Sequence, residues 1–340
     1  MTPPSRSRVD PAELARRLEA VGVPVERDVP VADLTTYHVG GPVAVLARVD
    51  TPVALGAVAR ALADALPPLL VVGRGSNLLV TDAGFDGLGV VLGGEFDAID
   101  VAAAGPGVVR AGAAVPLPVL ARRTAAAGLA GLEFFVGIPG SVGGAVRMNA
   151  GGHGRETADV LVAAEVVDLA GPGSVPERRP GSVPERRPGS VPRSRSLTEL
   201  GFGYRRSALT ATEIVTAATF RVEPGSAAAG EAALADVVRW RREHQPGGSN
   251  AGSVFANPPG DSAGRLIDSL GLKGLRVGGA VVSDKHANFF QAEAGASADD
   301  VRALVVEVRR RVAAATGVTL MPELRMVGFD DADLDLGATR

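Results

Sequence analysis

Three glycine-rich segments carry residue types that could bind an anion through the backbone. They are residues 35–42 (Thr-Thr-Tyr-His-Val-Gly-Gly-Pro), 72–79 (Val-Gly-Arg-Gly-Ser-Asn-Leu-Leu) and 136–151, which contains Gly-Ile-Pro-Gly-Ser-Val-Gly-Gly and Met-Asn-Ala-Gly. Because glycine has no side chain, backbone N–H groups in such segments can approach a phosphate closely. Each segment alone is compatible with a tight turn. The three together favour a dinucleotide, whose pyrophosphate needs several convergent donors.

Other site chemistries are not indicated. No segment has the pattern Gly-x-Gly-x-x-Gly after a strand, so a Rossmann nucleotide site is not supported. The chain has no cysteine, which excludes disulfides, thiolate metal sites and a cysteine nucleophile. The four histidines lie far apart and show no metal-ligand spacing, so no metal is expected.

Composition sets the broad class of the protein. The 340 residues are 46% hydrophobic and 21% charged, with a net charge of −3, as in a globular protein without a nucleic-acid partner. No apolar run is long enough to span a membrane, and none follows the basic N-terminus as in a secretory signal. We therefore expect a cytoplasmic protein without a membrane partner, by default a monomer.

The order of the motifs resembles the UDP-N-acetylenolpyruvoylglucosamine reductase family, also called UDP-N-acetylmuramate dehydrogenase. The resemblance runs from about residue 34 to about residue 328. Besides the glycine-rich segments it rests on further motifs: Gly-Tyr-Arg-Arg-Ser (203–207), Ala-Gly-Ser-Val-Phe (251–255), Gly-Leu-Lys-Gly (271–274), Gly-Gly-Ala (278–280), Lys-His-Ala-Asn-Phe (285–289) and Pro-Glu (322–323). Each motif is weak evidence alone, but the series in the family's order is specific.

The resemblance implies an α+β protein. Two α+β subdomains of the PCMH (vanillyl-alcohol-oxidase) type would hold non-covalent FAD, and a smaller α+β domain would bind substrate. NADPH would supply hydride through FAD to UDP-N-acetylglucosamine enolpyruvate, giving UDP-N-acetylmuramate for peptidoglycan synthesis. Hydride would add to C3 and a proton to C2 of the enolpyruvyl group.

Three residues match the family's catalytic positions. Arg205 would bind the substrate carboxylate, since a guanidinium can donate two parallel hydrogen bonds and stays charged. Ser253 would donate the proton. Glu323 would orient the substrate carboxylate or take part in proton transfer, and the sequence leaves these two roles open. Without the motifs, the three residues read as an exposed strand end, a loop serine and a glutamate paired with Arg325.

The resemblance also implies binding residues. The expected FAD-binding residues are Thr36, Val39, Gly40, Gly73, Gly75, Ser76, Asn77, Gly137, Ile138, Pro139, Gly140, Ser141, Gly143 and Gly144. The expected substrate-binding residues are Tyr204, His244, Asn257, Lys273, His286 and Arg325. Lys273 and His286 are equally compatible with a structural surface role.

Two positions depart from the family pattern. Ala256 stands where a lysine often follows the phenylalanine of the serine loop, and His244 stands where a basic residue is expected. Both changes put the affinity for substrate phosphate in doubt without altering the reaction class. Two rival functions remain: another PCMH-type flavin oxidoreductase, and a non-catalytic UDP-sugar-binding protein, which would be expected to have lost the three catalytic residues.

The elements that must position these residues alternate between helix and strand. Helices are expected from capping signals and apolar spacing at 11–21, 52–66, 117–127, 232–243, 263–270 and 298–316. Strands are expected at 43–49, 69–72, 89–92, 108–111, 163–169, 201–206, 279–282 and 288–292. Residues 137–154 are expected to form a loop.

We expect an FAD-binding domain over residues 1–225, with two subdomains divided near residue 95. Residues 226–320 would form the substrate-binding domain, and residues 321–340 would return to the FAD domain and end in a tail. The near-identical octads of residues 172–195 (Pro-Gly-Ser-Val-Pro-Glu-Arg-Arg and variants) are too short and polar to bury a core. We expect a disordered insert there.

Overall fold

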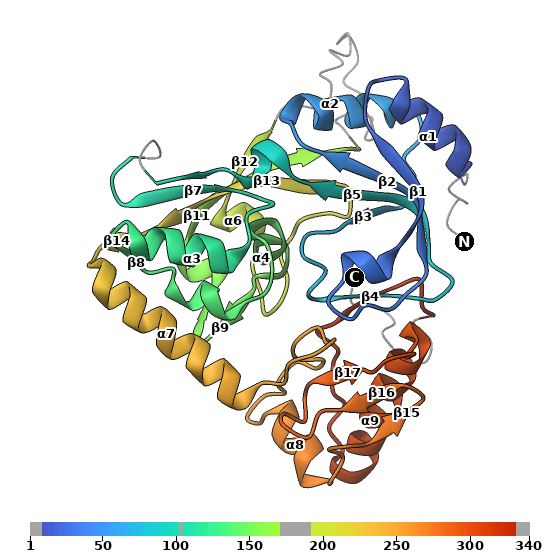
Figure 1. Ribbon diagram of the computed structural model, residues 1–340, viewed down its shortest axis with the longest axis vertical. Coiled ribbons are helices and arrows are strands. Elements are labelled where there is room, and N and C mark those ends of the chain that lie inside the picture. Colours follow the sequence, from blue (N-terminus) through green and yellow to red (C-terminus); the bar gives the residue numbers. More distant parts are fainter. Residues whose placement is uncertain (1–8, 102–104, 171–191, 331–340) are drawn as a thin grey trace, which may run out of the picture. The chain divides into compact units, whose positions relative to one another are not determined.

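The computed structural model describes residues 9–101, 105–170 and 192–330 (Figure 1). The chain divides into two compact units, each assembled from separate stretches of sequence. Unit 1 contains residues 1–28, 44–73 and 86–238, and unit 2 contains residues 29–43, 74–85 and 239–340. This division follows packing, and the domain boundaries expected near residues 225 and 320 stay predictions.

The first layer of unit 1 is a four-stranded sheet covered by two helices (Figure 1). Its strand order is β1–β2–β5–β3, with β3 and β5 parallel. The elements are α1 (Pro11–Glu19), β1 (Val25–Pro30), β2 (Pro42–Val49), α2 (Pro52–Ala61), β3 (Leu69–Val71), β5 (Phe85–Leu92) and the 3-10 helix η2 (Gly94–Asp97). Apolar residues of both helices pack against strand residues such as Val45 and Val90.

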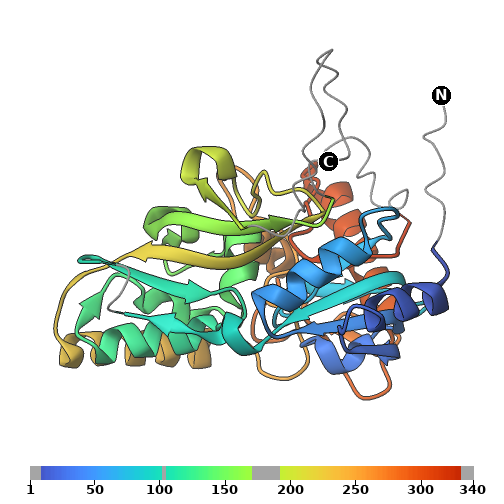
Figure 2. The same ribbon diagram turned by 90° about the horizontal axis from the view of Figure 1, so that it is seen from above.

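The second layer of unit 1 is a five-stranded antiparallel sheet of order β12–β11–β13–β7–β6 (Figure 2). Its strands are β6 (Ile99–Asp100), β7 (Val108–Gly112), β11 (Leu161–Asp168), β12 (Arg193–Ser196) and β13 (Glu213–Arg221). Helices α3 (Leu117–Ala126) and α4 (Val142–Met148) contribute to the core on one face of this sheet. The shorter elements are β8 (Leu129–Ala130), η3 (Glu133–Gly137), β9 (Gly151–Gly152), β10 (Arg155–Glu156), α5 (Thr157–Val160), α6 (Leu197–Leu200) and β14 (Glu223–Pro224).

Unit 2 has its own core around helix α9 (Ala298–Thr316) and a three-stranded antiparallel sheet. The other elements are η1 (Val31–Leu34), β4 (Leu78–Val80), α8 (Ala263–Ser269), β15 (Arg276–Val277), β16 (Ala280–Val282), β17 (Phe290–Ala292) and β18 (Arg325–Val327). Strands β4 and β18 form a parallel pair. The division between the units falls within helix α7 (Ala227–His244).

Most expected elements are present and the α+β class is confirmed, but three expectations were wrong. The expected loop of residues 137–154 contains helix α4, because Ser141 caps it and its apolar residues pack into the core. Residues 201–206 form a turn after α6 rather than a strand. Residues 193–195 of the expected insert belong to β12, which pairs with β11; residues 172–191 lie outside the described residues.

Candidate active site

The FAD-binding candidates of unit 1 come from two distant segments that meet at Gly73 and Ser141. A Cβ atom on Gly73 would lie 2.5 Å from Ser141 Oγ, closer than side chains normally pack. Ser141 is buried and caps α4, with Gly144 N–H donating to its hydroxyl at 3.4 Å. Glycine at position 73 is therefore what allows the first segment to approach the second.

The N–H groups at the start of α4 already have acceptors within the protein. Val142 N–H donates to Val115 O and Gly143 N–H to Ala113 O, both at 2.9 Å, while Gly144 N–H donates to Ser141 Oγ. The backbone that remains for an anion therefore lies before the helix. Of the candidates there, Pro139 has no N–H and Ile138 N–H donates to Phe135 O at 3.0 Å, so the donors of this segment are Gly140 and Ser141.

The other FAD-binding candidates lie in unit 2. Gly75 adopts φ +61° against Leu34 O, and Gly40 adopts φ +109° against Val80 O, so the backbone is tightly folded at both. Thr36 N–H donates to Gly75 O at 3.3 Å. Val39 is buried in the unit 2 core, and Ser76 is half-buried in the turn before β4.

Two buried hydroxyl groups in this part of the chain are unsatisfied among the described residues. Thr35 Oγ1 and Tyr37 Oη are buried and have no hydrogen-bond partner among the residues that the structure describes. Buried hydroxyls are normally satisfied by protein, water or ligand. Together with the close backbone approach at Gly73 and Gly75, these atoms fit a segment that receives a polar cofactor.

Arg205 occupies a strained position in a two-residue turn. Gly203 and Arg206 exchange both backbone hydrogen bonds, at 3.1 and 3.2 Å, and Arg205 has φ +53°, which L-residues rarely adopt. Its guanidinium donates to Gly151 O at 3.2 Å and lies 5.0 Å from the ring centroid of exposed Tyr204. Such outliers are concentrated at functional sites.

The end of α4 holds the Arg205 turn in place. Asn149 is fully buried, and its side chain donates to Gly203 O at 3.1 Å and accepts from Ala158 N–H at 3.0 Å. Ser207 Oγ donates to Arg147 O at 2.8 Å. The turn is therefore attached at both ends to one helix terminus.

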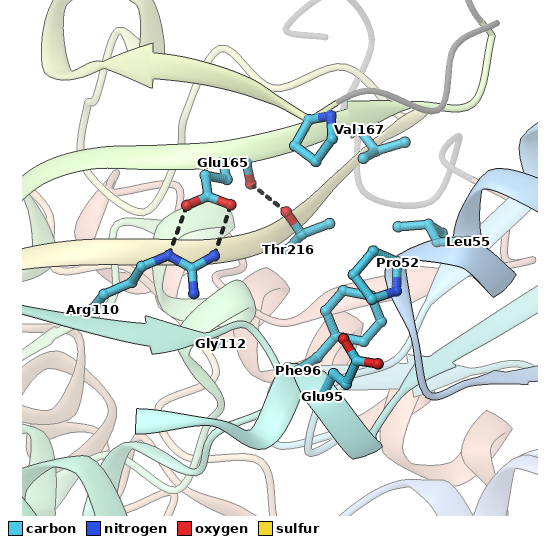
Figure 3. A pocket seen from close by; sticks show the side chains of 10 residues that line it. Pro52, Leu55, Glu95, Phe96, Arg110, Gly112, Glu165, Val167 and Thr216 are labelled. Atoms are coloured by element: carbon cyan, nitrogen blue, oxygen red, sulfur yellow. Dashed lines mark hydrogen bonds and ion pairs between the residues drawn. The ribbon is translucent and has the colours of Figure 1, made fainter. Parts of the chain in front are cut away.

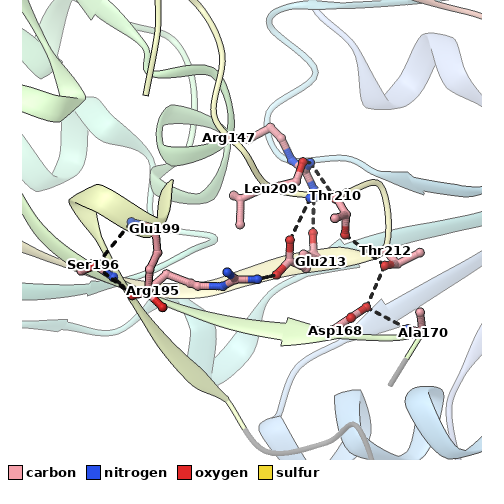
Figure 4. Close-up of polar contacts among 10 residues, drawn as sticks. All are labelled: Arg147, Asp168, Ala170, Arg195, Ser196, Glu199, Leu209, Thr210, Thr212 and Glu213. Carbon is pink, nitrogen blue, oxygen red and sulfur yellow. Dashed lines mark hydrogen bonds and ion pairs between the residues drawn. The ribbon is translucent and has the colours of Figure 1, made fainter. Parts of the chain in front are cut away.

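Arg147 fastens the chain that follows the turn (Figure 4). Its guanidinium donates to the carbonyl oxygens of Leu209 and Thr210 at 2.9 Å and of Glu213 at 2.6 Å. The Glu213 carboxylate is buried and paired with Arg195 of β12. Here Arg147 and Arg195 are structural cations that connect α4 and β12 to the start of β13.

Ser253 and Glu323 are brought together by backbone pairing in unit 2. Glu323 N–H donates to the carbonyl of Val254, the residue after Ser253, at 2.8 Å, and Ala256 N–H donates to Met321 O at 2.8 Å. On its other side the Ser253 segment forms an antiparallel bridge to Phe289. Both candidate side chains are half-buried.

Asn77 connects the glycine-rich segment of unit 2 to the Glu323 segment. Its Nδ2 donates to Glu323 O at 3.1 Å, and its backbone carbonyl accepts from Arg325 N–H at 3.1 Å. Thr36 Oγ1 likewise donates to Asn250 O at 2.6 Å, three residues before Ser253. Cofactor-binding and catalytic candidates of this unit therefore share one hydrogen-bond network.

Three of the substrate-binding candidates form an electrostatic cluster in unit 2. Burial is the main cause that lowers the pKa of His286, and the neighbouring charges of Lys273 and His244 act in the same direction. Lys273 Nζ pairs with Asp268 at 2.8 Å. His244 stacks on Trp240 with ring centroids 4.6 Å apart.

The remaining substrate-binding candidates are exposed. Asn257 Oδ1 accepts from Ala263 N–H at 3.0 Å, at the start of α8. Arg325 begins β18. Tyr204 and Arg205 belong to unit 1, while Ser253, Glu323 and the other substrate-binding candidates belong to unit 2.

A separate cavity of about 130 Å³ in unit 1 contains none of the predicted site residues (Figure 3). It lies between the start of α2, η2 and the five-stranded sheet, beside the Arg110–Glu165 pair, whose two hydrogen bonds are 2.7 and 2.8 Å. Because both charges already neutralise each other, we do not assign the chemistry to this cavity.

Sequence reasoning missed the residues that hold the candidates. Asn149 and Asn288 were quoted in motifs without a role, although the chain has only five asparagines and all five lie in or beside the motif segments. The concentration of asparagines in these segments is the sequence signal that indicates a role for Asn149 and Asn288.

Two family models match the chain. One, described as an FAD binding domain, matches residues 43–173. The other, described as the C-terminal domain of UDP-N-acetylenolpyruvoylglucosamine reductase, matches residues 244–327. The candidate flavin and catalytic segments of the sequence fall largely within these two ranges.

Curated relatives and a solved structure agree with the models. The chain is 41% identical to UDP-N-acetylenolpyruvoylglucosamine reductase of Azorhizobium caulinodans over 97% of this chain and 99% of the relative. It is 42% identical to that of Methylorubrum extorquens over 88% and 90%. The crystal structure of the reductase from Thermus caldophilus matches with 38% identity and a TM-score of 0.73, covering 90% of this chain and 99% of that one.

Proposed function

The chain belongs to the UDP-N-acetylenolpyruvoylglucosamine reductase family, and on that premise we propose how its residues carry out the family's reaction. It is an FAD-containing oxidoreductase with the PCMH-type flavin-binding fold. It reduces UDP-N-acetylglucosamine enolpyruvate to UDP-N-acetylmuramate with NADPH, a step of peptidoglycan synthesis.

FAD binding is assigned to the backbone of the glycine-rich segments. Gly140 and Ser141 supply backbone N–H groups, and Ser141 its hydroxyl, to the pyrophosphate, because Pro139 has no N–H and the N–H groups of Ile138 and of residues 142–144 are already paired. Gly73, next to Ser141, lets the backbone approach. The chemistry that FAD supplies when bound is hydride transfer from NADPH to C3 of the enolpyruvyl group.

Arg205 binds the substrate carboxylate. As hydride adds to C3, negative charge moves onto C2 and its carboxylate, and a preorganised guanidinium stabilises that charge. The positive φ of Arg205 and its attachment to Gly151 and Asn149 support this role, since they hold the guanidinium in advance of substrate binding.

Ser253 donates the proton to C2, and Glu323 acts beside it. Protonation at C2 and hydride addition at C3 together saturate the double bond. The observation that carries this assignment is the 2.8 Å hydrogen bond from Glu323 N–H to Val254 O, which places the two residues on paired backbone. Glu323 orients the substrate carboxylate or takes part in the proton transfer.

The substrate diphosphate and uridine bind at Asn257, Lys273 and His286, which all lie in unit 2. Arg325 and His244 are further substrate contacts, and Tyr204 lines the site beside Arg205. We further propose that the protein works as a cytoplasmic monomer, which light scattering of the purified protein tests. Among the described residues, none of the helices has the length and apolar character needed to cross a membrane.

One anaerobic titration tests the proposed roles. NADPH should bleach the flavin absorbance in wild type, Ser253→Ala and Glu323→Gln alike. Addition of UDP-N-acetylglucosamine enolpyruvate should restore it quickly only in the wild type. Wild-type recovery in either variant would remove that residue from the mechanism. Recovery only with air would contradict the substrate itself.

A further inference from the structure

The side chain of Asn288 both accepts a hydrogen bond from and donates one to the backbone of Phe255, two residues after Ser253. Phe255 N–H donates to Asn288 Oδ1 at 3.0 Å, and Asn288 Nδ2 donates to Phe255 O at 2.8 Å. Asn288 is only 3% exposed. One amide side chain thus takes the place of a neighbouring strand for Phe255.

Backbone contacts extend this attachment toward Ser253. Val254 N–H donates to Asn288 O at 2.8 Å, and Ser253 itself forms an antiparallel bridge with Phe289. On the other side of Ser253, Gly252 adopts φ +76° with no atom near its missing Cβ. The loop before Ser253 is held at Asn250, which accepts from Thr36 Oγ1 at 2.6 Å and from Gly252 N–H at 3.1 Å, while Asn288 holds the segment on the C-terminal side of the serine.

His286 in turn fixes Asn288. The N–H of Asn288 donates to Nδ1 of His286 at 3.2 Å. Nδ1 can accept only when it carries no proton, so the bond requires the neutral imidazole. The ring lies 4.8 Å from the ring of Phe289 and is half-buried.

The titratable groups around His286 come from helices α7 and α8 and from the turn after α8. Asp268 lies within α8 and forms an ion pair with Lys273, which follows that helix. His244 lies at the end of α7. Gly264 of α8 also packs against the ring. The Asp268 carboxylate favours the protonated ring, the charges of Lys273 and His244 oppose it, and protonation would remove the Nδ1 acceptor for Asn288 N–H.

We propose that Asn288 is a positioning residue for the proton donor Ser253 and that neutral His286 holds Asn288 in its working orientation. This inference rests on the proposed function of Ser253. A serine hydroxyl is a weak acid, so its proton transfer depends on an accurately held geometry. A displacement of about 1 Å at a reacting group can cost about 100-fold in rate.

The direct test uses Asn288→Asp, which keeps the side-chain shape but replaces the donor to Phe255 O with an oxygen. Stopped-flow absorbance should show wild-type FAD content and a wild-type rate of flavin reduction by NADPH. Flavin reoxidation by UDP-N-acetylglucosamine enolpyruvate should be slower by about 100-fold. Unchanged reoxidation in a folded, flavin-bound variant would overturn the proposal.

A double variant separates positioning from general stability. If Asn288 acts through Ser253, then Ser253→Ala combined with Asn288→Asp should be no slower than Ser253→Ala alone. If the double variant reoxidised its flavin more slowly than Ser253→Ala by the full factor measured for Asn288→Asp alone, Asn288 would act independently of Ser253 and the inference would be overturned. If Ser253→Ala itself reoxidised normally, the proposed function of Ser253 would fail first, and the inference with it.

His286→Phe carries the test if Asn288→Asp does not fold. Phenylalanine keeps a ring against Phe289 but removes the Nδ1 acceptor. In the wild type, the limiting rate of reoxidation should fall as His286 becomes protonated at low pH, and the variant should be slow and lack this dependence. A variant with a wild-type limiting rate and only a raised substrate KM would assign His286 to phosphate binding alone and overturn its positioning role.

Discussion

A Cβ atom at Gly73 would stand 2.5 Å from Ser141 Oγ, so the glycine and the helix-capping serine occupy adjoining space. Both residues come from segments that we assign to FAD. The serine hydroxyl is already used to cap α4 through Gly144 N–H. Any side chain at position 73 must therefore disturb the cap, the cofactor segment, or both.

Gly73→Ala should weaken FAD binding while leaving the fold intact. The new methyl group has to displace Ser141 Oγ, and a lost helix cap costs about 1 kcal/mol. We expect the Kd for FAD to rise by about tenfold, measured by fluorescence quenching on adding FAD to apoprotein. Gly247→Ala is the control, because a Cβ there meets nothing within 4 Å. Equal affinities in both variants would contradict the close approach.

Arg205→Lys should impair substrate reduction but not flavin reduction. Lysine keeps the charge but loses the two parallel hydrogen bonds to a carboxylate. We expect kcat/KM for UDP-N-acetylglucosamine enolpyruvate to fall by about 100-fold, or about 2.7 kcal/mol. The rate at which NADPH bleaches the flavin is the internal control. A parallel loss in both half-reactions would point to a general defect of the turn.

Tyr37→Phe should stabilise the apoprotein. The hydroxyl is fully buried without a described partner, and leaving such a group unsatisfied costs about 1–3 kcal/mol. Urea unfolding of the apoprotein should show a gain of about 1 kcal/mol. Burial also raises the pKa of Tyr37, so wild-type stability should fall above pH 10 as the unfolded state ionises first. A destabilised variant would show that the hydroxyl has a partner in solution.

His286 should make the protein less stable in mild acid. Its pKa is lowered in the folded state, chiefly by burial, from an ordinary value of 6.5. As pH falls below 6.5 the unfolded state therefore binds a proton before the native state does, and the free energy of unfolding decreases; above 6.5 the contribution is complete. Urea midpoints at about pH 7.5 and 5.5 should differ less in His286→Phe than in the wild type. The same difference in both proteins would assign the effect to other groups.

Capping signals predicted whole elements where local chemistry decides the fold. Ser297 and Asp300 form the expected capping box of α9, which ends at Gly317 as the sequence indicated. Helix α4 was missed because Gly143 and Gly144 oppose helix formation locally, by about 1 kcal/mol each. Its stability comes from tertiary contacts, such as Gly143 against Ala113, that no local pattern reveals.

The site was predicted as motifs but not as contacts. The motif order identified Arg205, Ser253 and Glu323, because catalytic chemistry restricts residue type. It did not reveal the positive φ of Arg205, which depends on Asn149 holding Gly203 O. Nor did it reveal the two hydrogen bonds between the Asn288 side chain and the Phe255 backbone, because a side chain that pairs with distant backbone leaves no periodic signal in the sequence.

The parallel pair of β4 and β18 joins Leu78–Val80 to Arg325–Val327. During synthesis β4 leaves the ribosome long before its partner strand exists, so this pairing cannot form until translation has passed Val327. Unit 1 contains no residue beyond Val238 and has no such delay. Nascent chains should thus complete the Arg205 turn early and the Glu323 segment last, which makes catalytic competence a late event in biogenesis.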